Sequence, residues 1–285
     1  MSNSYSGSLV AVRDVDSLRR RVQAWRREGR SVALVPTMGA LHKGHLTLMD
    51  RAQKMADRVI ATIFVNPKQF GVGEDFNSYP RPEHQDFELL NTAGVHLLFA
   101  PDVAVMYPQG FSTAVSVAGL SDVLDGAHRP GHFNGVATIV SKLLLQTLPD
   151  IALFGEKDYQ QLAIIKRLVV DLNIPVDIIG VPTVRDTDGL ALSSRNAYLT
   201  PEERAKAPAL HRAITAAAAT ITAKGDIASA VSKARDEILK AGFANVDYVE
   251  ARHAETLQPL QAGEPGRILA AAQLGRARLI DNVAV

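Results

Sequence analysis

The chain has 285 residues, 47% of them hydrophobic and 21% charged, with a formal net charge of +1 and no cysteine. This composition is typical of a globular protein with a large buried core, and the near-zero charge argues against a surface built to bind nucleic acid. The lack of cysteine excludes disulfides, zinc thiolates and a thiol nucleophile. No apolar run has membrane-span length and no signal-peptide pattern opens the chain, so we expect a cytoplasmic enzyme without nucleic-acid or membrane partners.

Residues 15–30 predict the first helix. Val15, Leu18, Val22 and Trp25 recur at helical spacing, which leaves the arginines between residues 19 and 30 on the solvated face. We interpret this Arg-rich stretch as a helix surface rather than a nucleic-acid patch.

Short apolar, β-branched runs then alternate with amphipathic stretches. They cover residues 32–35, 59–65, 95–99, 151–154 and 176–181. Such alternation requires crossover connections, so it predicts an α/β fold, a Rossmann-like doubly wound parallel sheet with helices on both faces.

The pattern changes near residues 182–186. Ala-rich helical segments at 201–223 and 227–239 precede strand-like runs at 246–250 and 267–272. We predict a Rossmann-like domain over residues 1–183 and a smaller α+β domain over residues 184–285.

His42 and His45 follow the run at 32–35 and a short turn. Residues three apart share one face of a helix, and a helix that begins after a parallel strand presents unpaired N–H groups that suit phosphate. Gly39 and Gly44 permit close backbone approach. Half of a metal site, or surface histidines without a role, are the alternatives. We favour a nucleotide site.

Polar residues also follow the run at 59–65 and precede a helical run at 134–148. Asn66 is typical of a turn, whereas turn geometry does not require Gln69. Arg129, beside His128 and His132, suits an anion, although a solvated loop is the plainer interpretation.

Two further clusters carry groups that suit a nucleotide. Gly155 permits backbone approach, Lys157 offers a charge for phosphate and Asp158 can accept from ribose hydroxyls, unless Asp158 only caps a helix. The hydroxyl- and guanidinium-bearing loop at 193–195 suits closure over a triphosphate, and a polar turn between domains is its alternative.

In this order along the chain, the clusters resemble the pantoate–β-alanine ligase (pantothenate synthetase) family of the nucleotidyltransferase superfamily. The resemblance runs from Arg30 through Asn282 and includes Met-Gly-Ala-Leu-His-Lys-Gly-His at 38–45 and Leu-Ile-Asp-Asn at 279–282. It implies ATP-dependent joining of (R)-pantoate to β-alanine through pantoyl adenylate, with release of AMP and pyrophosphate. The product, pantothenate, is a coenzyme A precursor. It also implies Mg²⁺, a homodimer and a carboxy-terminal lid.

The resemblance also implies roles for single residues. The implied catalytic residues are His45 as the proton donor, and His42, Lys157 and Arg195. The implied ATP residues are Met38, Gly39, Ala40, Leu41, His42, Lys43, Gly44, His45, Gly155, Glu156, Lys157, Asp158, Val184, Leu192, Ser193, Ser194 and Arg195. The implied substrate residues are Gln69, Gln161, Asn66 and Arg129.

Two positions depart from the family pattern. Lys43 stands where relatives often have an acidic residue, which makes the local field more positive. Relatives often have adjacent aspartates in segment 81–86, where this chain has only Asp86, the implied Mg²⁺ contact.

Two other functions remain possible at this point. One is an adenylyltransferase that transfers AMP to a phosphate ester and forms no amide. The other is a nucleotide- or RNA-binding module without catalysis, which the near-zero net charge disfavours.

Overall fold

The computed structural model describes residues 8–71 and 73–285, so residues 1–7 of the predicted first domain lie outside the described residues. The chain divides into two compact units. Unit 1 comprises Met1–Val117, Arg129–Gly155 and Ile164–Val181, and unit 2 comprises Ala118–His128, Glu156–Ala163 and Pro182–Val285.

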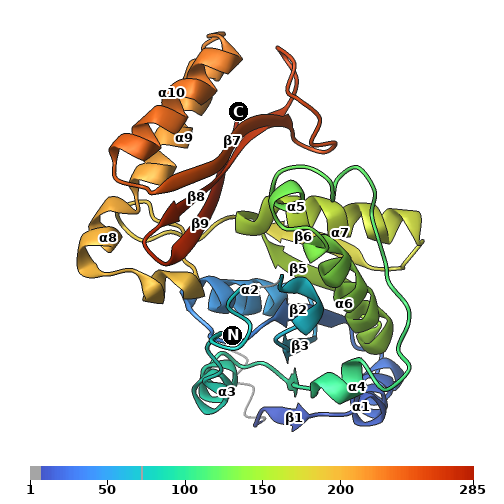
Figure 1. Cartoon of the computed structure of the whole chain (residues 1–285). Helices are drawn as coiled ribbons and strands as arrows, with labels where there is room; N and C mark the ends of the chain where they lie inside the picture. Colours follow the sequence, from blue (N-terminus) through green and yellow to red (C-terminus); the bar gives the residue numbers. More distant parts are fainter. Residues whose placement is uncertain (1–7, 72) are drawn as a thin grey trace. The chain divides into compact units, whose positions relative to one another are not determined.

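Unit 1 is built on a six-stranded parallel sheet with the order β1-β4-β3-β2-β5-β6 (Figure 1). Its strands are β1 (Val10–Val12), β2 (Val32–Thr37), β3 (Arg58–Ile63), β4 (Leu97–Phe99), β5 (Ile151–Gly155) and β6 (Asp177–Val181). The predicted fold class is confirmed. The predicted runs locate every strand except β1, a short strand at the edge of the sheet.

Helices cover both faces of this sheet. The helices of unit 1 are α1 (Val15–Arg27), α2 (Lys43–Gln53), α3 (Glu83–Thr92), α4 (Val103–Met106), α6 (His132–Thr147) and the part of α7 (Tyr159–Asp171) from residue 164. On one face, Ala33 and Val35 of β2 share a buried cluster with Met49 of α2. Because side chains alternate along a strand, buried Val32 and Leu34 point to the other face. There α6 contacts β2 and packs against α1.

The first helix confirms the prediction made for the Arg-rich stretch. Leu18 and Val22 of α1 are buried, and Asp14 caps the helix by accepting a 2.8 Å hydrogen bond from the backbone nitrogen of Ser17. The arginines at positions 19, 20, 21, 26, 27 and 30 are exposed. Those up to residue 27 form a solvated face of α1, as the apolar spacing predicts, and Arg30 lies just beyond its end.

The strand order reverses direction at β2. From β2 the sheet continues to one side through β3 and β4, and on the other side through β5 and β6. Parallel α/β sheets bind ligands at such a switch point, outside the carboxyl ends of the strands. The turn after β2 and Gly155 at the end of β5 flank this point.

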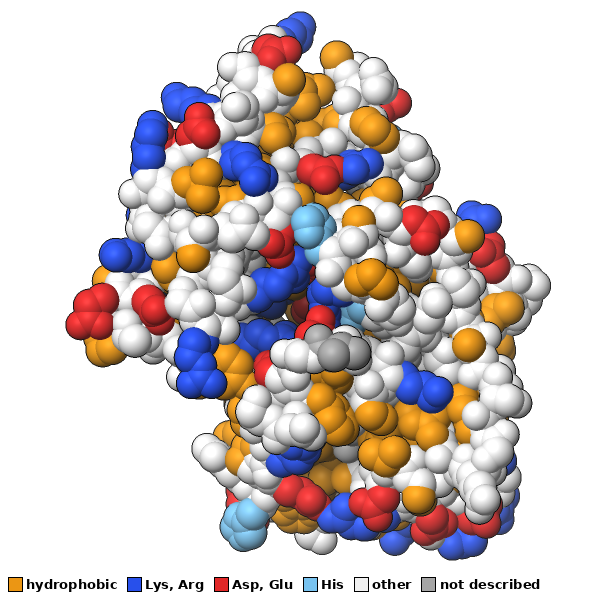
Figure 2. All heavy atoms as spheres, in the orientation of Figure 1, with side chains coloured by type: hydrophobic (Ala, Val, Ile, Leu, Met, Phe, Trp, Pro, Cys, Tyr) orange, Lys and Arg blue, Asp and Glu red, His pale blue; other side chains and the backbone are white. Residues whose placement is uncertain are grey.

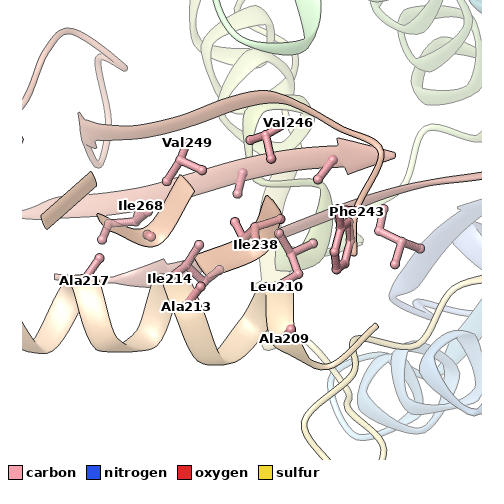
Figure 3. Close-up of a cluster of buried hydrophobic side chains, with 14 of the residues drawn as sticks. Ala209, Leu210, Ala213, Ile214, Ala217, Ile238, Phe243, Val246, Val249 and Ile268 are labelled. Atoms are coloured by element: carbon pink, nitrogen blue, oxygen red, sulfur yellow. The ribbon is translucent and has the colours of Figure 1, made fainter. Parts of the chain in front are cut away.

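Unit 2 contains an antiparallel sheet with the order β7-β8-β9. The strands are β7 (Asn245–His253), β8 (Gly266–Leu274) and β9 (Ala277–Ala284), and the helices are α5 (Asp125–His128), α8 (Pro201–Lys206), α9 (Ala209–Thr222) and α10 (Ile227–Lys240). Helices α9 and α10 lie side by side and contact the sheet (Figure 1). Figure 3 shows Ile214 of α9 and Ile238 of α10 in the buried cluster with Val249 of β7.

Two local predictions for unit 2 were incomplete. The helix expected over residues 201–223 is interrupted between α8 and α9 at Pro208, because proline lacks the N–H that a continuous helix requires. Strand β9 was not predicted, since Asp281 and Asn282 break its apolar pattern, yet both side chains are buried.

Two segments from earlier in the chain also belong to unit 2. The Asp125 carboxylate of α5 accepts hydrogen bonds from the Tyr248 hydroxyl at 3.0 Å and from Arg278 at 2.6 Å. Gln160 donates to the carbonyls of Leu120 and Val123. The functional division at residues 183 and 184 stays a prediction.

On the face shown in Figure 2, Lys and Arg side chains are interspersed with Asp and Glu side chains over the region of α9 and α10. Among the helices described in residues 8–71 and 73–285, none combines the length and the hydrophobicity that a membrane span requires.

Candidate active site

The turn after β2 has a backbone conformation that explains its glycine. Gly39 has a φ of 83° and Ala40 a φ of 50°, both in the left-handed region. A Cβ on Gly39 would lie 2.9 Å from Oδ2 of Asp86 and 3.1 Å from Cγ2 of Ile63. Both the conformation and the close approach therefore require glycine here.

Asp86 of α3 braces this turn. Its Oδ2 accepts a 2.8 Å hydrogen bond from the backbone nitrogen of Ala40, and its Oδ1 accepts one of the same length from Leu41. The side chain is buried, and burial raises the pKa of Asp86 above its usual value although both N–H groups favour the charged form. The segment that leads to His42 is thus held from a distant helix.

This arrangement does not fit the implied role of Asp86 as a Mg²⁺ contact. Both carboxylate oxygens serve backbone N–H groups, and the residue is buried, whereas a Mg²⁺ ligand has to reach an ion that keeps several waters. In the part of the chain that the structure describes, no three His, Asp or Glu side chains are grouped as a metal site.

His42 and His45 stand at the amino terminus of α2. His42 is the N-cap, and its Nδ1 accepts a 3.1 Å hydrogen bond from the backbone nitrogen of Gly44. Nδ1 of His45 accepts from the backbone nitrogen of His42 at 3.3 Å, and the ring centroids lie 4.1 Å apart. Because Nδ1 accepts in each ring, the ring proton is assigned to Nε2, a donor that suits an anion.

The first turn of α2 suits a phosphate. It contains no acidic side chain, its first residue is Lys43, and the helix has 11 residues. The positive end of the helix dipole favours negative charge at this terminus, where the backbone nitrogens of His42 and Gly44 are already bound by the two rings. The predicted placement of the histidine pair, on a helix that begins after a parallel strand, is confirmed.

Asn66 and Gln69 belong to the short helix η1 (Pro67–Gln69) and its cap. Asn66 is buried, donates to Gln69 Oε1 and to the Gly135 carbonyl at 3.1 Å each, and accepts from the Tyr107 hydroxyl at 2.7 Å. Gln69 Nε2 lies 3.0 Å from Sδ of Met38. The structure therefore brings Gln69 beside the turn after β2, and Asn66 orients it.

Gly135 of α6 was missed from the sequence. A Cβ at this position would lie 2.2 Å from the carbonyl oxygen of Lys68 and 2.6 Å from the backbone nitrogen of Gln69. Only glycine lets α6 approach η1 so closely. A glycine inside the apolar helical run at 134–148 was the available signal.

Arg129 is paired with Glu74, a partner that the sequence did not indicate. Its Nε and Nη2 donate to the two carboxylate oxygens of Glu74 at 2.7 Å each, and Nη2 lies 3.4 Å from the Gln69 carbonyl. Burial opposes ionisation of Glu74, but the bonds from Arg129 prevail and lower its pKa from 4.5 to about 2. Binding of a substrate anion by Arg129 would require this pair to open.

In unit 2, the segment Glu156–Asp158 forms the short helix η2, which directly follows β5. Arg267 lies 3.5 Å from the Glu156 carboxylate and 3.9 Å from the ring centroid of Tyr159. Gln161 is half-buried in the first turns of α7.

The loop at 184–195 is also part of unit 2. The backbone nitrogen of Leu192 donates to the Val184 carbonyl at 2.9 Å, and the Ser193 hydroxyl accepts from the backbone nitrogen of Arg195 at 3.3 Å, at the start of η3 (Ser194–Tyr198). Lys157 and Ser193 line one pocket of this unit, together with Asp281. Two clusters that lie far apart in the sequence therefore meet there.

Comparison with known proteins shows full-length similarity to one family. A sequence model of the pantoate-beta-alanine ligase family matches residues 10–284. A pantothenate synthetase of Paramagnetospirillum magneticum is 62% identical over 281 residues, which cover 98% of this chain and 99% of that protein. One from Caulobacter vibrioides is 56% identical over 282 residues, 98% of this chain and 99% of that protein.

Solved structures agree. Pantothenate synthetase from Thermus thermophilus matches with a TM-score of 0.91 and 48% identity, over 96% of this chain and 98% of that one. Pantoate-beta-alanine ligase from Francisella tularensis, complexed with beta-gamma ATP and beta-alanine, matches with a TM-score of 0.82 and 34% identity, over 97% and 98% of the two chains. This chain therefore belongs to the pantoate–β-alanine ligase family.

Proposed function

We propose that this chain joins (R)-pantoate to β-alanine, with ATP as co-substrate, and forms pantothenate, a coenzyme A precursor. The observation that carries the proposal is the histidine pair at the amino terminus of α2, where both Nδ1 atoms are engaged by backbone N–H groups. Two Nε2–H donors at a helix terminus suit the phosphates of a nucleotide. The ATP complex of the relative from Francisella tularensis supports ATP as the nucleotide.

The chemistry requires two displacements. A carboxylate does not react with an amine unaided, because its oxygen is a poor leaving group. In the first step a pantoate carboxylate oxygen attacks the α-phosphorus of ATP, and the bond to pyrophosphate breaks. In the second step the neutral amine of β-alanine attacks the acyl carbon of pantoyl adenylate, AMP leaves, and the amine gives up a proton.

The chain's own residues stabilise and orient these steps. We assign charge stabilisation on the phosphates to His42, His45, Lys157 and Arg195, with His45 donating a hydrogen bond from Nε2. Mg²⁺ comes with ATP as part of the substrate and neutralises phosphate charge. ATP binding is assigned to residues 38–45, 155–158, 184 and 192–195.

Substrate selection is assigned to two carboxamides. Gln69 and Gln161 can donate and accept hydrogen bonds at once, which suits pantoate's hydroxyls and carboxylate. Asn66 supports Gln69 through its 3.1 Å hydrogen bond. Arg129 would meet a substrate anion only after release from Glu74.

Three properties of the whole enzyme extend the proposal. Residues 1–183 bind ATP and pantoate, and residues 184–285 act as a lid that carries the 192–195 loop. The enzyme works as a homodimer in the cytoplasm.

A coupled assay of AMP formation tests the proposal. Purified protein receives ATP, Mg²⁺, pantoate and β-alanine, and each component is omitted in turn. AMP should accumulate only in the complete mixture, with pantothenate in equal amount. Sustained pyrophosphate release with a phosphate ester in place of both acids, with the AMP group transferred to that ester, would instead identify an adenylyltransferase.

A further inference from the structure

Strand β9 carries two adjacent buried polar residues, Asp281 at 4% and Asn282 at 3% exposure. Burying polar groups costs free energy unless they are hydrogen-bonded, so their partners show what they are for. Adjacent side chains on a strand point to opposite faces. The flanking residues agree: Leu279 packs in the cluster with α9, and Ile280 packs in the cluster with Tyr159.

Asn282 is bound on both sides of its carboxamide. Nδ2 donates to the carbonyl oxygens of Glu156 and Lys157 at 2.9 Å each. Oδ1 accepts from the guanidinium of Arg267, which is itself stacked on Tyr159. A carboxamide has the donors and the acceptor that these contacts need, whereas a carboxylate has acceptors alone.

Asp281 engages the loop on the other face. It accepts two hydrogen bonds from Arg185, at 2.6 and 2.8 Å, and its Oδ2 lies 3.4 Å from Nδ1 of His211. Arg185 also donates to the Gly189 carbonyl at 3.1 Å. Lys157 and Asp281 both line one pocket of unit 2.

We infer that Asn282 is a positioning residue for Lys157: by binding the two successive carbonyls of residues 156 and 157, it sets the direction in which the Lys157 side chain leaves the backbone. The inference rests on the proposed function, in which Lys157 contacts ATP phosphate. Neither the ligand nor the reacting atoms touch Asn282 in this account. Because Lys157 is proposed to contact ATP, loss of Asn282 should weaken the binding of ATP more than that of pantoate.

Asn282→Asp separates positioning from packing. The new carboxylate keeps the size of the side chain and the acceptor for Arg267, but it places an oxygen against two carbonyl oxygens. The matched control is Asn245→Asp on β7. Asn245 is exposed, and its Nδ2 donates to Asp247 at 2.7 Å. The same exchange there also replaces a donor by an acceptor that faces another acceptor, but at a place remote from Lys157.

The measurements are the Kd of a non-hydrolysable ATP analogue, the Kd of pantoate and the thermal midpoint of each full-length variant. For Asn282→Asp we expect the Kd of the ATP analogue to rise about tenfold or more, because two hydrogen bonds are lost, with pantoate affinity changed much less. Asn245→Asp should leave both Kd values at the wild-type level. An unchanged Kd for the ATP analogue in Asn282→Asp, with a lowered thermal midpoint, would show a purely structural role and overturn the inference.

Asn282→Ser covers the case in which Asn282→Asp does not fold. Its hydroxyl can donate to one carbonyl, so an intermediate rise in the Kd of the ATP analogue is expected, and a wild-type value overturns the inference. Failure of the proposed function is distinguishable, because the wild-type protein itself would then form no pantothenate.

Discussion

Oδ2 of Asp86 lies 2.8 Å from the backbone nitrogen of Ala40, a residue 46 positions earlier in the chain. This contact links α3 to the turn that precedes His42. It indicates that Asp86 shapes the proposed nucleotide site, and it occupies the carboxylate that the family resemblance implies for Mg²⁺.

Asp86→Asn should weaken ATP binding without abolishing the fold. The amide keeps one acceptor but turns an NH₂ group toward the second backbone N–H. Loss of a hydrogen bond to a charged group corresponds to about 1.5–3 kcal/mol in the free energy of unfolding. Urea unfolding and calorimetry with an ATP analogue measure both effects. If raising the Mg²⁺ concentration restored wild-type affinity, Asp86 would be a metal contact and the bracing role would be wrong.

His45→Ala should stay folded and lose activity. Removal of one donor to developing charge typically costs about 2.7–4 kcal/mol of transition-state stabilisation. Loss of the capping contact should also lower the free energy of unfolding by about 1 kcal/mol. The ratio kcat/KM for pantothenate formation measures the first effect. His84→Ala, at an exposed position of α3, is the control and should retain full activity. Near-normal turnover of His45→Ala would contradict the role assigned to His45.

Gln161→Ala should affect mainly pantoate binding, whereas Gln160→Ala should affect mainly stability. Gln160 is buried, and its side chain donates to the carbonyls of Leu120 and Val123, so its loss should lower the free energy of unfolding. Gln161 is proposed to contact pantoate, so its loss should weaken pantoate by about 1.5–3 kcal/mol and ATP far less. Calorimetry with each ligand decides, and equal weakening of both ligands by Gln161→Ala would refute the assignment.

The Arg129–Glu74 pair should contribute a pH-dependent part of stability. Glu74 has a folded-state pKa of about 2 against 4.5 for the unconstrained group, so its contribution is fully present above 4.5 and is lost as the pH falls toward 2. The difference in free energy of unfolding between wild type and Glu74→Gln should be constant near neutral pH and shrink through this range. A difference that persists unchanged at pH about 2 would show that the pair is not ionic.

Gly135→Ala should displace Gln69. The new Cβ would fall 2.2 Å from the Lys68 carbonyl, so η1 must shift. We expect a weaker Kd for pantoate, measured by calorimetry. Val136→Ala, which removes buried volume from the same helix, is the control and should lower the free energy of unfolding without changing this Kd. Unchanged pantoate affinity in Gly135→Ala would show that Gln69 is not positioned by this contact.

The sequence predicts features that depend on local pattern. Apolar runs located the strands from β2 to β6, and the spacing of His42 and His45 predicted their place at the start of α2. The sequence does not predict the residues that hold the site in place. Asp86, Glu74 and Asn282 act on segments far away in the chain, and such pairings depend on how elements pack rather than on residue spacing. The buried pair on β9 even concealed its strand, because polar side chains broke the apolar alternation.

In the proposed reaction, ATP activates pantoate before the amine of β-alanine reacts. Exchange of labelled pyrophosphate into ATP tests it most directly, with protein, ATP, Mg²⁺ and pantoate present and β-alanine absent. The two-step account predicts exchange that depends on pantoate and proceeds without the amine, since adenylate formation is reversible when water is excluded. Exchange that requires β-alanine would contradict the separate activation step, and exchange without any acid would contradict pantoate as the substrate.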